Sequence, residues 1–269
     1  MNLNDVSTQL LFTTVPIWIE GKRGKSFGTG FIYAIALKEK PATSLPFLVT
    51  NAHVVEGASR GILEFVKREG EAPARGQRIR VELDGPSLTQ FLDPANDIAV
   101  VPIGGVLNEL ESTGRGAFFR TIDPSLIPRA EAWSDLSAIE DVTFIGYPSG
   151  LYDQHNSTPV VRRGITATPA WNDFANTPSF LIDAGVFPGS SGSPVFILNR
   201  GAYTTQNGLN IGHRLLFLGI LSESMIRRDP KAPDVFLGLG KVIKSTSLAT
   251  FLEPIAERLS SAVAQPAKP

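Results

Sequence analysis

Short apolar runs separated by turn residues recur along the whole chain. The first 103 residues contain six runs rich in Val, Ile, Phe and Thr, which read VPIWIE, GTGFIYAIAL, PFLVTNA, GILEFVKR, RIRVEL and DIAVVPI. Six more follow from residue 141, which read DVTFIGYP, PVVRRGITATP, SFLIDAG, SGSPVFIL, LLFLGILSE and DVFLGLGKVI. Runs of this length and composition, bounded by turn residues, are typical of β-strands. Because about six strands are enough to close a small barrel, the pattern predicts an all-β fold of two six-stranded antiparallel β-barrels packed together.

Two stretches depart from the strand pattern. Residues 104–138 are polar and carry Gly, Pro and Ser, so we interpret them as the connection between the halves, with one short helical turn at VLNELE. From Ser247 the sequence LATFLEPIAERLSSAV predicts a C-terminal helix, begun or broken near Pro254, with a frayed tail. The expected domains are an N-terminal barrel over 1–115, a linker and C-terminal barrel over 116–246, and the helix with its tail over 247–269.

Composition and charge narrow the classes of function. The 269 residues carry 25 Lys and Arg against 26 Asp and Glu, so no strong field for nucleic acid or anionic lipid is expected. The pairs Arg162-Arg163 and Arg227-Arg228 are isolated, and we interpret them as solvated surface. No run of 18 apolar residues predicts a membrane span. The chain has no cysteine, which excludes disulfides and a thiol nucleophile and fits a reducing, cytoplasmic location.

Three short segments contain the residue types of nucleophilic catalysis. They are TNAHVV at residues 50–55, NDIAVV at 96–101 and PGSSGSP at 188–194. In their order of His, Asp and Ser they resemble the catalytic segments of the chymotrypsin-like (trypsin-like) serine peptidases. The surrounding sequence resembles the bacterial branch that includes the high-temperature-requirement proteases and the glutamyl endopeptidases. Recurrent motifs of that branch match GTGF at 28–31, GYP at 146–148 and the run at 183–194, so the resemblance covers most of residues 10–250.

The resemblance implies a triad of Ser191, His53 and Asp97. A serine hydroxyl is a poor nucleophile at neutral pH until a base removes its proton, and an imidazole can do so and then protonate the leaving amine. A buried carboxylate fixes the tautomer of the imidazole and stabilises the imidazolium. Asp93 and Asp84 stay as the alternatives for that carboxylate.

The loop around the nucleophile is expected to hold the developing oxyanion. Its small residues allow the backbone N–H groups to turn inward, where a larger side chain would obstruct the turn and the substrate. By resemblance the donors are the N–H groups of Gly189 and Ser191, with Ser190 between them shaping the loop. Digestive members of the family carry at position 190 an aspartate that pairs with a freshly cut N-terminus. Ser190 cannot form that ion pair, so activation by N-terminal cleavage is not expected.

The primary substrate pocket is also assigned by resemblance. Its expected lining consists of the segment before the nucleophile and the strand after Leu221, which contribute Gly185 as the base with Val186, Phe187, Pro188, Ser222, Glu223 and Ser224. Gly185 supplies no carboxylate for a buried Lys or Arg, and Leu221 stands where glutamate-specific relatives place a histidine. A small or medium apolar side chain (Val, Ala or Leu) is therefore expected on the acyl side of the cut. Two alternatives remain open, in which Glu223 attracts a basic residue to a neighbouring subsite or Asp183 reaches the pocket.

Rival chemistries do not fit the order of residues. An α/β-hydrolase needs G-x-S-x-G followed by Asp and then His, but Ser193 replaces the last glycine and no acidic residue lies between Ser191 and His213. The sequence GKS at 24–26 lacks the first glycine of a phosphate loop. With three scattered histidines, no cysteine and no H-E-x-x-H, no zinc ligand set is present. No metal and no cofactor are expected.

The predicted function is that of a serine endopeptidase acting on a protein or peptide substrate. Only about 20 residues follow the last predicted strand, so the peptide-binding regulatory domain of the high-temperature-requirement proteases is not expected. Three sources of control are left open, which are a regulatory partner protein, scarcity of the substrate and the genomic context. The alternative is a protease-like binding module whose triad is present and whose site is dormant. Neither a nucleic acid nor a membrane is an expected partner.

Overall fold

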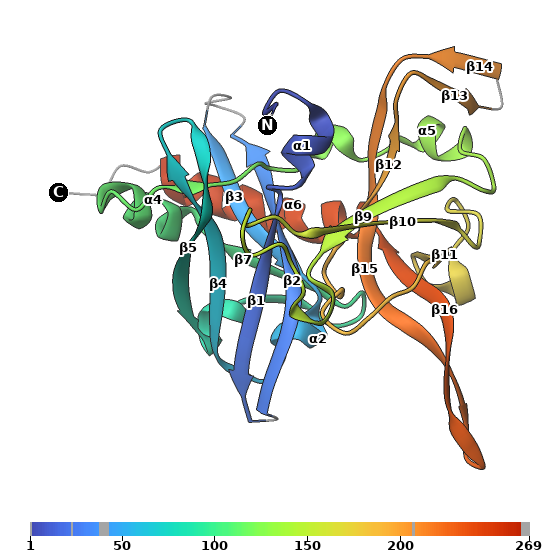
Figure 1. Ribbon diagram of the computed structural model, residues 1–269, viewed down its shortest axis with the longest axis horizontal. Helices are drawn as coiled ribbons and strands as arrows, with labels where there is room; N and C mark the ends of the chain where they lie inside the picture. The colour runs from blue at the N-terminus through green and yellow to red at the C-terminus, as the bar shows by residue number, and fades with distance from the viewer. Residues whose placement is uncertain (1, 23, 38–42, 206–207, 265–269) are drawn as a thin grey trace.

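The computed structural model describes residues 2–22, 24–37, 43–205 and 208–264. These form two strand-rich halves, and a long C-terminal helix packs against both (Figure 1). The helices are α1 (Val6–Leu10), α2 (Ala52–Val55), α3 (Gly85–Leu88), α4 (Gly104–Ser112), α5 (Ala130–Ser134) and α6 (Ser245–Ala264). The N-terminal strands are β1 (Thr14–Gly21), β2 (Gly24–Ala36), β3 (Ser44–Thr50), β4 (Ala58–Glu69), β5 (Ala72–Asp84), β6 (Phe91–Asp93), β7 (Ile98–Pro102) and β8 (Ala117–Phe118). The C-terminal strands are β9 (Asp141–Gly146), β10 (Val160–Thr166), β11 (Ser179–Asp183), β12 (Pro194–Asn199), β13 (Ala202–Thr205), β14 (Gly208–Ile211), β15 (Arg214–Asp229) and β16 (Ala232–Lys244).

The C-terminal half is a closed antiparallel barrel. Its six strands pair in the order β10-β11-β16-β15-β12-β9, and each contains one of the six apolar runs predicted for this half. Apolar side chains from neighbouring strands fill the interior, among them Phe144, Phe180 and Val195. Strands β13 and β14 form a separate two-stranded sheet outside the barrel, and Figure 1 shows β15 and β16 continuing away from it as a long hairpin. The predicted six-stranded C-terminal barrel is confirmed.

The N-terminal half differs from the six-stranded barrel predicted for it. All six predicted runs form strands, but the sheet has eight, in the order β5-β4-β1-β2-β3-β7-β6 with β8 paired to β4. Within the part of the chain that the structure describes, these pairings do not close into a ring. One end of the order is β6, which has only three residues and so few backbone groups with which to continue the sheet. Strands β6 and β8 are too short to produce a periodic pattern, which is why the sequence did not predict them.

The connection and the terminal helix are more helical than predicted. The expected turn at VLNELE is the nine-residue helix α4, and α5 follows it before the barrel begins. Helix α6 starts at Ser245 and continues through Pro254. Proline lacks the N–H that would bond the preceding turn. The helix is nevertheless buried on both sides of Pro254, at Leu252, Ile255 and Ala256, so packing stabilises the helix where the hydrogen bond is missing. None of the described helices is both long and apolar enough to cross a membrane.

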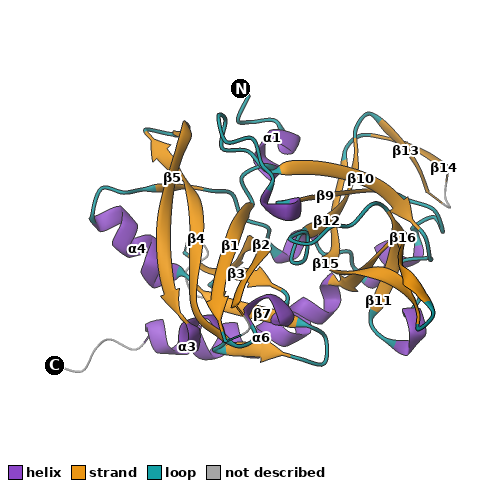
Figure 2. Cartoon of the chain, turned by 60° about the horizontal axis from the view of Figure 1, so that its bottom comes forward, coloured by secondary structure: helices purple, strands orange, loops and turns teal. Residues whose placement is uncertain are grey.

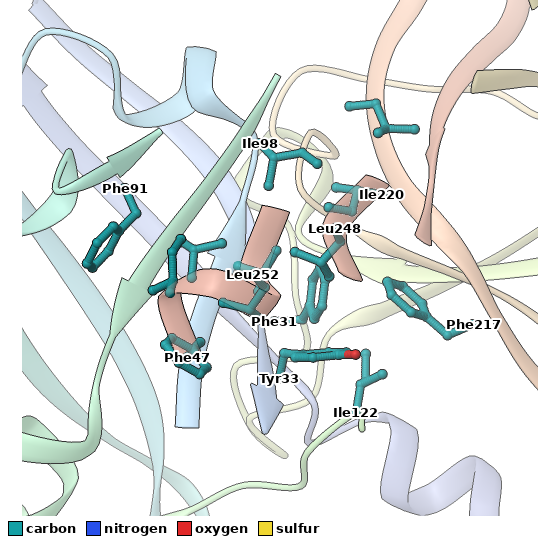
Figure 3. Packing of buried hydrophobic residues seen from close by; sticks show 14 of the residues in the cluster. Phe31, Tyr33, Phe47, Phe91, Ile98, Ile122, Phe217, Ile220, Leu248 and Leu252 are labelled. Atoms are coloured by element: carbon teal, nitrogen blue, oxygen red, sulfur yellow. The ribbon is translucent and has the colours of Figure 1, made fainter. Parts of the chain in front are cut away.

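One apolar cluster joins the two halves to α6. Figure 3 shows Phe31 from β2 and Phe217 from β15 lying beside Leu248 and Leu252 of α6. The ring centroid of Phe217 lies 5.4 Å from that of Phe31 and 5.7 Å from that of Phe196, in edge-on and tilted arrangements that aromatic pairs favour. Figure 2 shows the same helix running along both halves. Burial of this cluster therefore fixes the position of one half relative to the other.

We expect truncation of Phe217 to destabilise the whole protein. Its ring is fully buried and contacts residues of both halves, so Phe217→Ala should lower the free energy of unfolding by about 3–5 kcal/mol. The matched control is Phe236→Ala in the long hairpin, whose side chain is 63% exposed. That variant should change the free energy of unfolding by about 0.5 kcal/mol or less. Chemical denaturation measures both, and equal effects of the two substitutions would contradict the role of the cluster.

Candidate active site

His53 lies in the short helix α2, immediately after strand β3. Strand β3 ends at Thr50, and α2 then brings the imidazole to the boundary between the halves. A Cβ on Gly28 would lie 2.5 Å from a methyl group of Val54, so only glycine allows β2 to pass this close to α2. The first glycine of the GTGF motif is therefore required by the packing of the histidine helix.

The carboxylate of Asp97 contacts both the ring and the backbone of His53. Its carboxylate lies 2.8 and 3.0 Å from His53 Nδ1 and accepts the His53 backbone N–H at 2.9 Å. The hydroxyl of Ser222, from the other half, donates to Asp97 Oδ2 at 2.6 Å. The backbone of Asp97 is in the left-handed region at φ 51°, which aspartate tolerates, and Asn51 Nδ2 donates to its carbonyl at 3.0 Å.

The hydrogen bonds to Asp97 set its charge. Burial raises the pKa of the Asp97 carboxyl, but the donors from the His53 ring, the Ser222 hydroxyl and the His53 backbone together outweigh burial and hold the pKa below its usual value. The group is therefore ionised at neutral pH and can only accept hydrogen bonds. The proton between the two side chains then belongs to His53 Nδ1, which leaves Nε2 of a neutral imidazole as the basic nitrogen.

The two alternative carboxylates have other partners. Asp93 accepts the backbone N–H of Asn96 at 3.2 Å and its side-chain amide at 2.6 Å. Asp84 is the N-cap of α3 and accepts the backbone N–H of Ser87 at 2.8 Å. Of the three aspartates considered from the sequence, Asp97 is the one that the structure brings to His53.

Ser191 lies in the loop between β11 and β12. Its hydroxyl donates to the backbone carbonyl of Ser222 at 2.8 Å. Among the hydrogen bonds of the described residues, none joins Ser191 Oγ to His53 Nε2. The same residue, Ser222, therefore contacts the predicted nucleophile through its carbonyl and the predicted orienting carboxylate through its hydroxyl.

The peptide groups of this loop have a defined orientation. The carbonyl of Pro188 accepts the Ser149 N–H at 2.6 Å, and the carbonyl of Ser190 accepts the Ser193 N–H at 3.0 Å. Because C=O and N–H point in opposite directions across a trans peptide, the N–H groups of the following residues, 189 and 191, point away from those partners. Gly189 adopts φ 87°, a conformation that favours glycine.

Thr29, the second residue of GTGF, links the nucleophile loop to the N-terminal half. Its buried hydroxyl donates to the Gly189 carbonyl at 2.8 Å and accepts the Tyr147 N–H at 3.0 Å. Its backbone N–H donates to the Ser191 carbonyl at 2.9 Å, and its own carbonyl accepts the Thr50 hydroxyl at 2.7 Å. The sequence analysis did not assign this role, although a threonine between two glycines in an apolar strand was a signal for it.

The residues expected to line the substrate pocket form two touching segments. The Ser224 hydroxyl donates to the Val186 carbonyl at 3.0 Å, so the two expected walls are bonded to each other. Glu223 is exposed and lies 3.4 Å from Lys241 Nζ, with which it forms an ion pair. Phe187 is half-exposed, and Asp183 is exposed at the end of β11.

The expectation that Arg162 and Arg163 are both solvated surface is wrong for Arg162. The Arg163 side chain is 71% exposed and forms an ion pair with Asp141 at 2.8 Å. Arg162 is only partly exposed, and its Nη1 is buried. Its guanidinium lies against the ring of Phe187.

Other candidate chemistry is not assembled by the described part of the chain. His155 and His213 are exposed and lie outside the three motifs. Over the described ranges, no group of three His, Cys, Asp or Glu side chains is arranged to hold a metal ion.

Comparisons with known proteins agree with the fold. A family model described as "Trypsin-like peptidase domain" matches residues 28–202. The solved structure titled "HtrA-type protease AlgW with tripeptide" is similar at a TM-score of 0.53 and 20% identity, covering 93% of this chain and 62% of that chain. The active form of the M. tuberculosis protease Rv3671c is similar at a TM-score of 0.52 and 18% identity, and the match covers 93% of this chain and 83% of that chain. A serine endoprotease from Yersinia pestis is similar at a TM-score of 0.51 and 19% identity, and the match covers 96% of this chain and 67% of that chain.

These structural likenesses concern the fold. This chain spans less than two thirds of the length of the AlgW chain, at 62%. A comparison of the sequence with curated proteins found no match.

We expect Ser222→Ala to change how the protein responds to acid. A carboxyl whose pKa is lowered on folding contributes stability above its unfolded pKa, and this contribution is lost as the pH falls through its folded pKa. Removing the Ser222 hydroxyl raises the folded pKa of Asp97, so the loss should begin at a higher pH than in the wild type. The free energy of unfolding, measured from about pH 6 to about pH 2, tests this. Ser224→Ala, which removes a hydroxyl without a contact to Asp97, should keep the wild-type profile, and an unchanged profile in Ser222→Ala would contradict the assignment.

We expect Thr29→Val to destabilise the loop that carries Ser191. Valine keeps the shape but leaves the Gly189 carbonyl and the Tyr147 N–H without the hydroxyl, which should lower the free energy of unfolding by about 3 kcal/mol. The matched control is Thr13→Val, at another buried threonine. The Leu10 carbonyl that accepts the Thr13 hydroxyl also accepts the Thr13 backbone N–H, so it keeps a partner when the hydroxyl is removed. That control should lose about 1 kcal/mol or less. Equal losses of the two variants on chemical denaturation would show that the contacts of the Thr29 hydroxyl to Gly189 and Tyr147 do not stabilise the loop.

Proposed function

Because the chain belongs to the family of trypsin-like peptidase domains, we propose that it is a serine endopeptidase that cleaves peptide bonds of a protein partner. The family match confirms the resemblance found in the sequence. The observation that carries the proposal is that one residue of β15, Ser222, bonds both Asp97, which holds His53, and Ser191. Ser222 donates to the carboxylate that holds the His53 ring, and its carbonyl accepts the hydroxyl of Ser191.

In the proposed reaction Ser191 attacks the carbonyl carbon of the scissile peptide. Its hydroxyl proton passes to His53 Nε2, and the ionised Asp97 stabilises the imidazolium that forms. The tetrahedral intermediate collapses, the C–N bond breaks, and His53 returns the proton to the leaving amine. Water then hydrolyses the acyl-enzyme by the same route, with His53 as base and then as acid.

The N–H groups of Gly189 and Ser191 are the proposed oxyanion donors. Their orientation away from the Ser149 and Ser193 partners of the adjoining carbonyls supports this role. Donors that are fixed before the reaction do not have to reorganise when negative charge develops on the substrate oxygen. The Thr29 hydroxyl helps to fix them, because it holds the Gly189 carbonyl.

For catalysis Ser191 must exchange its acceptor. A rotation about its Cα–Cβ bond releases the Ser222 carbonyl and allows the hydroxyl to bond His53 Nε2. Catalytic hydrogen bonds are often misaligned without substrate and tighten in the complex, so this resting contact is compatible with activity.

The partners and location follow from the proposed activity. We propose a protein or peptide substrate, control by a regulatory partner protein, and a cytoplasmic location that suits a chain without cysteine. None of the three proposals requires a nucleic acid, a membrane or a cofactor.

The second candidate is a protease-like binding module with a dormant site. The hydrogen bond from Ser191 to Ser222 is the observation that favours it, because a hydroxyl held there is not activated by His53. A site whose loop does not release this contact would bind a peptide without cleaving it.

Labelling with a fluorophosphonate probe tests the proposal. The wild type should be labelled at Ser191, and Ser191→Ala or His53→Ala should lose labelling, with losses of peptide cleavage of about 10⁴–10⁶ in kcat. Asp97→Asn should cost about 10⁴ near neutral pH because it favours the wrong imidazole tautomer. Ser193→Ala is the matched control and should be labelled like the wild type, because the buried Ser193 hydroxyl has no hydrogen-bond partner among the described residues. A folded wild type that stays unlabelled would favour the dormant module, and labelling of Ser191→Ala would remove the assignment of the nucleophile.

A further inference from the structure

Strand β10 turns one of its two adjacent arginines into the barrel. Side chains alternate between the two faces of a strand, and residues 161, 163 and 165 are exposed while 160, 162, 164 and 166 are less so. Arg163 therefore faces solvent, where it pairs with Asp141, and Arg162 faces inward. The register pairs Arg162 with Phe144 of β9, and its guanidinium lies 5.6 Å from the centroid of that ring.

The guanidinium of Arg162 reaches the segment that precedes the nucleophile. Its central carbon lies 4.8 Å from the centroid of Phe187, a stacking distance for an arginine on an aromatic face. A Cβ on Gly185 would lie 2.9 Å from Arg162 Nη2, so the absence of a side chain at 185 makes room for the cation. Gly185 and Phe187 are the expected base and wall of the primary pocket. Arg162 thus places a positive charge beside the expected base of the pocket.

The cation is incompletely paired. Arg162 Nη1 is buried and has no hydrogen-bond partner among the described residues. A buried polar group without a partner is costly, and a buried cation more so. Among the hydrogen bonds and ion pairs of the described residues, none joins Arg162 to Glu223 or Asp183, and Glu223 pairs with Lys241. The planar, two-pronged guanidinium matches the geometry of a carboxylate or a phosphate, and among the unmodified side chains of a peptide only Glu and Asp carry a carboxylate.

We propose that Arg162 determines the specificity of the primary pocket and selects a glutamate or aspartate on the acyl side of the cut. The inference rests on the proposed endopeptidase function. A carboxylate in the pocket completes the hydrogen bonds of the guanidinium, whereas an apolar side chain leaves it unpaired and a Lys or Arg is repelled by it. This acidic preference replaces the apolar preference expected from Gly185 alone, because the Arg162 guanidinium lies beside Gly185.

Cleavage profiling with a proteome-derived peptide library tests the specificity. The wild type should cut after Glu or Asp, and Arg162→Gln should lower kcat/KM for an acidic peptide by about 100-fold relative to the same peptide with Gln before the cut. Arg163→Gln is the matched control, because it removes the neighbouring cation from the outer face of the same strand, and it should keep the wild-type profile. Dominant apolar or basic residues before the cut in the wild type, or an acidic preference that survives in Arg162→Gln, would overturn the proposal.

A binding measurement separates this inference from the proposed catalysis. In the Ser191→Ala background, a product-like peptide ending in Glu should bind at least about tenfold more tightly than the same peptide ending in Gln, and adding Arg162→Gln should abolish the difference. A far-ultraviolet circular dichroism spectrum and a free energy of unfolding of Arg162→Gln close to those of the wild type show that the variant is folded. An unlabelled wild type that still prefers the Glu peptide would reject catalysis and keep the role of Arg162. Equal binding of the two peptides would reject the role of Arg162 whether or not the protein is a peptidase.

Discussion

The buried hydroxyl of Thr29 is the contact through which the N-terminal sheet positions the loop of Ser191. It satisfies two backbone groups of the other half, the Gly189 carbonyl and the Tyr147 N–H, and the peptide of Thr29 itself bonds the Ser191 carbonyl. A buried backbone group left without a partner destabilises the fold by about 1–3 kcal/mol, so these bonds can form only when strand and loop are in register. The orientation of the proposed oxyanion donors, and hence the proposed chemistry, depends on that register.

Strand β15 of the C-terminal half makes a second contact across the boundary, this time to the N-terminal half. Ser222 uses its side chain for Asp97 of the N-terminal half and its backbone for Ser191 of its own half. Because one residue holds both groups, a shift of β15 would displace the carboxylate contact and the nucleophile together. The site is therefore set by two reciprocal contacts across the boundary, one from β2 to the nucleophile loop and one from β15 to the carboxylate.

The sequence was informative where periodicity or motif spacing was involved. Twelve apolar runs became strands because alternation and turn residues report burial on one face. The three motif segments pointed to His53, Asp97 and Ser191 as candidates, and the structure brings His53 and Asp97 into contact. The short strands β6 and β8 lie below the length at which a period can be detected. Arg162 was misjudged because the sequence does not show which of two adjacent arginines faces inward, since the phase of β10 relative to the barrel depends on pairing with β9. The sequence marked Thr29 only as a threonine between two glycines in an apolar strand, and it did not show the partners of the hydroxyl, which lie about 120 and 160 residues away.

The position of α6 in the chain has a consequence for when the site is completed during synthesis. This helix follows every strand, yet Leu248 and Leu252 belong to the same apolar cluster as Phe31 and Phe217 of the two halves. A nascent chain on the ribosome has both halves before it has α6, and so lacks the packing that fixes one against the other. His53 and Asp97 come from one half and Ser191 from the other, so the candidate site reaches its final geometry only after residue 252 has been made and packed. The order of elements thus delays the assembly of the proposed protease until its own polypeptide has folded around the cluster.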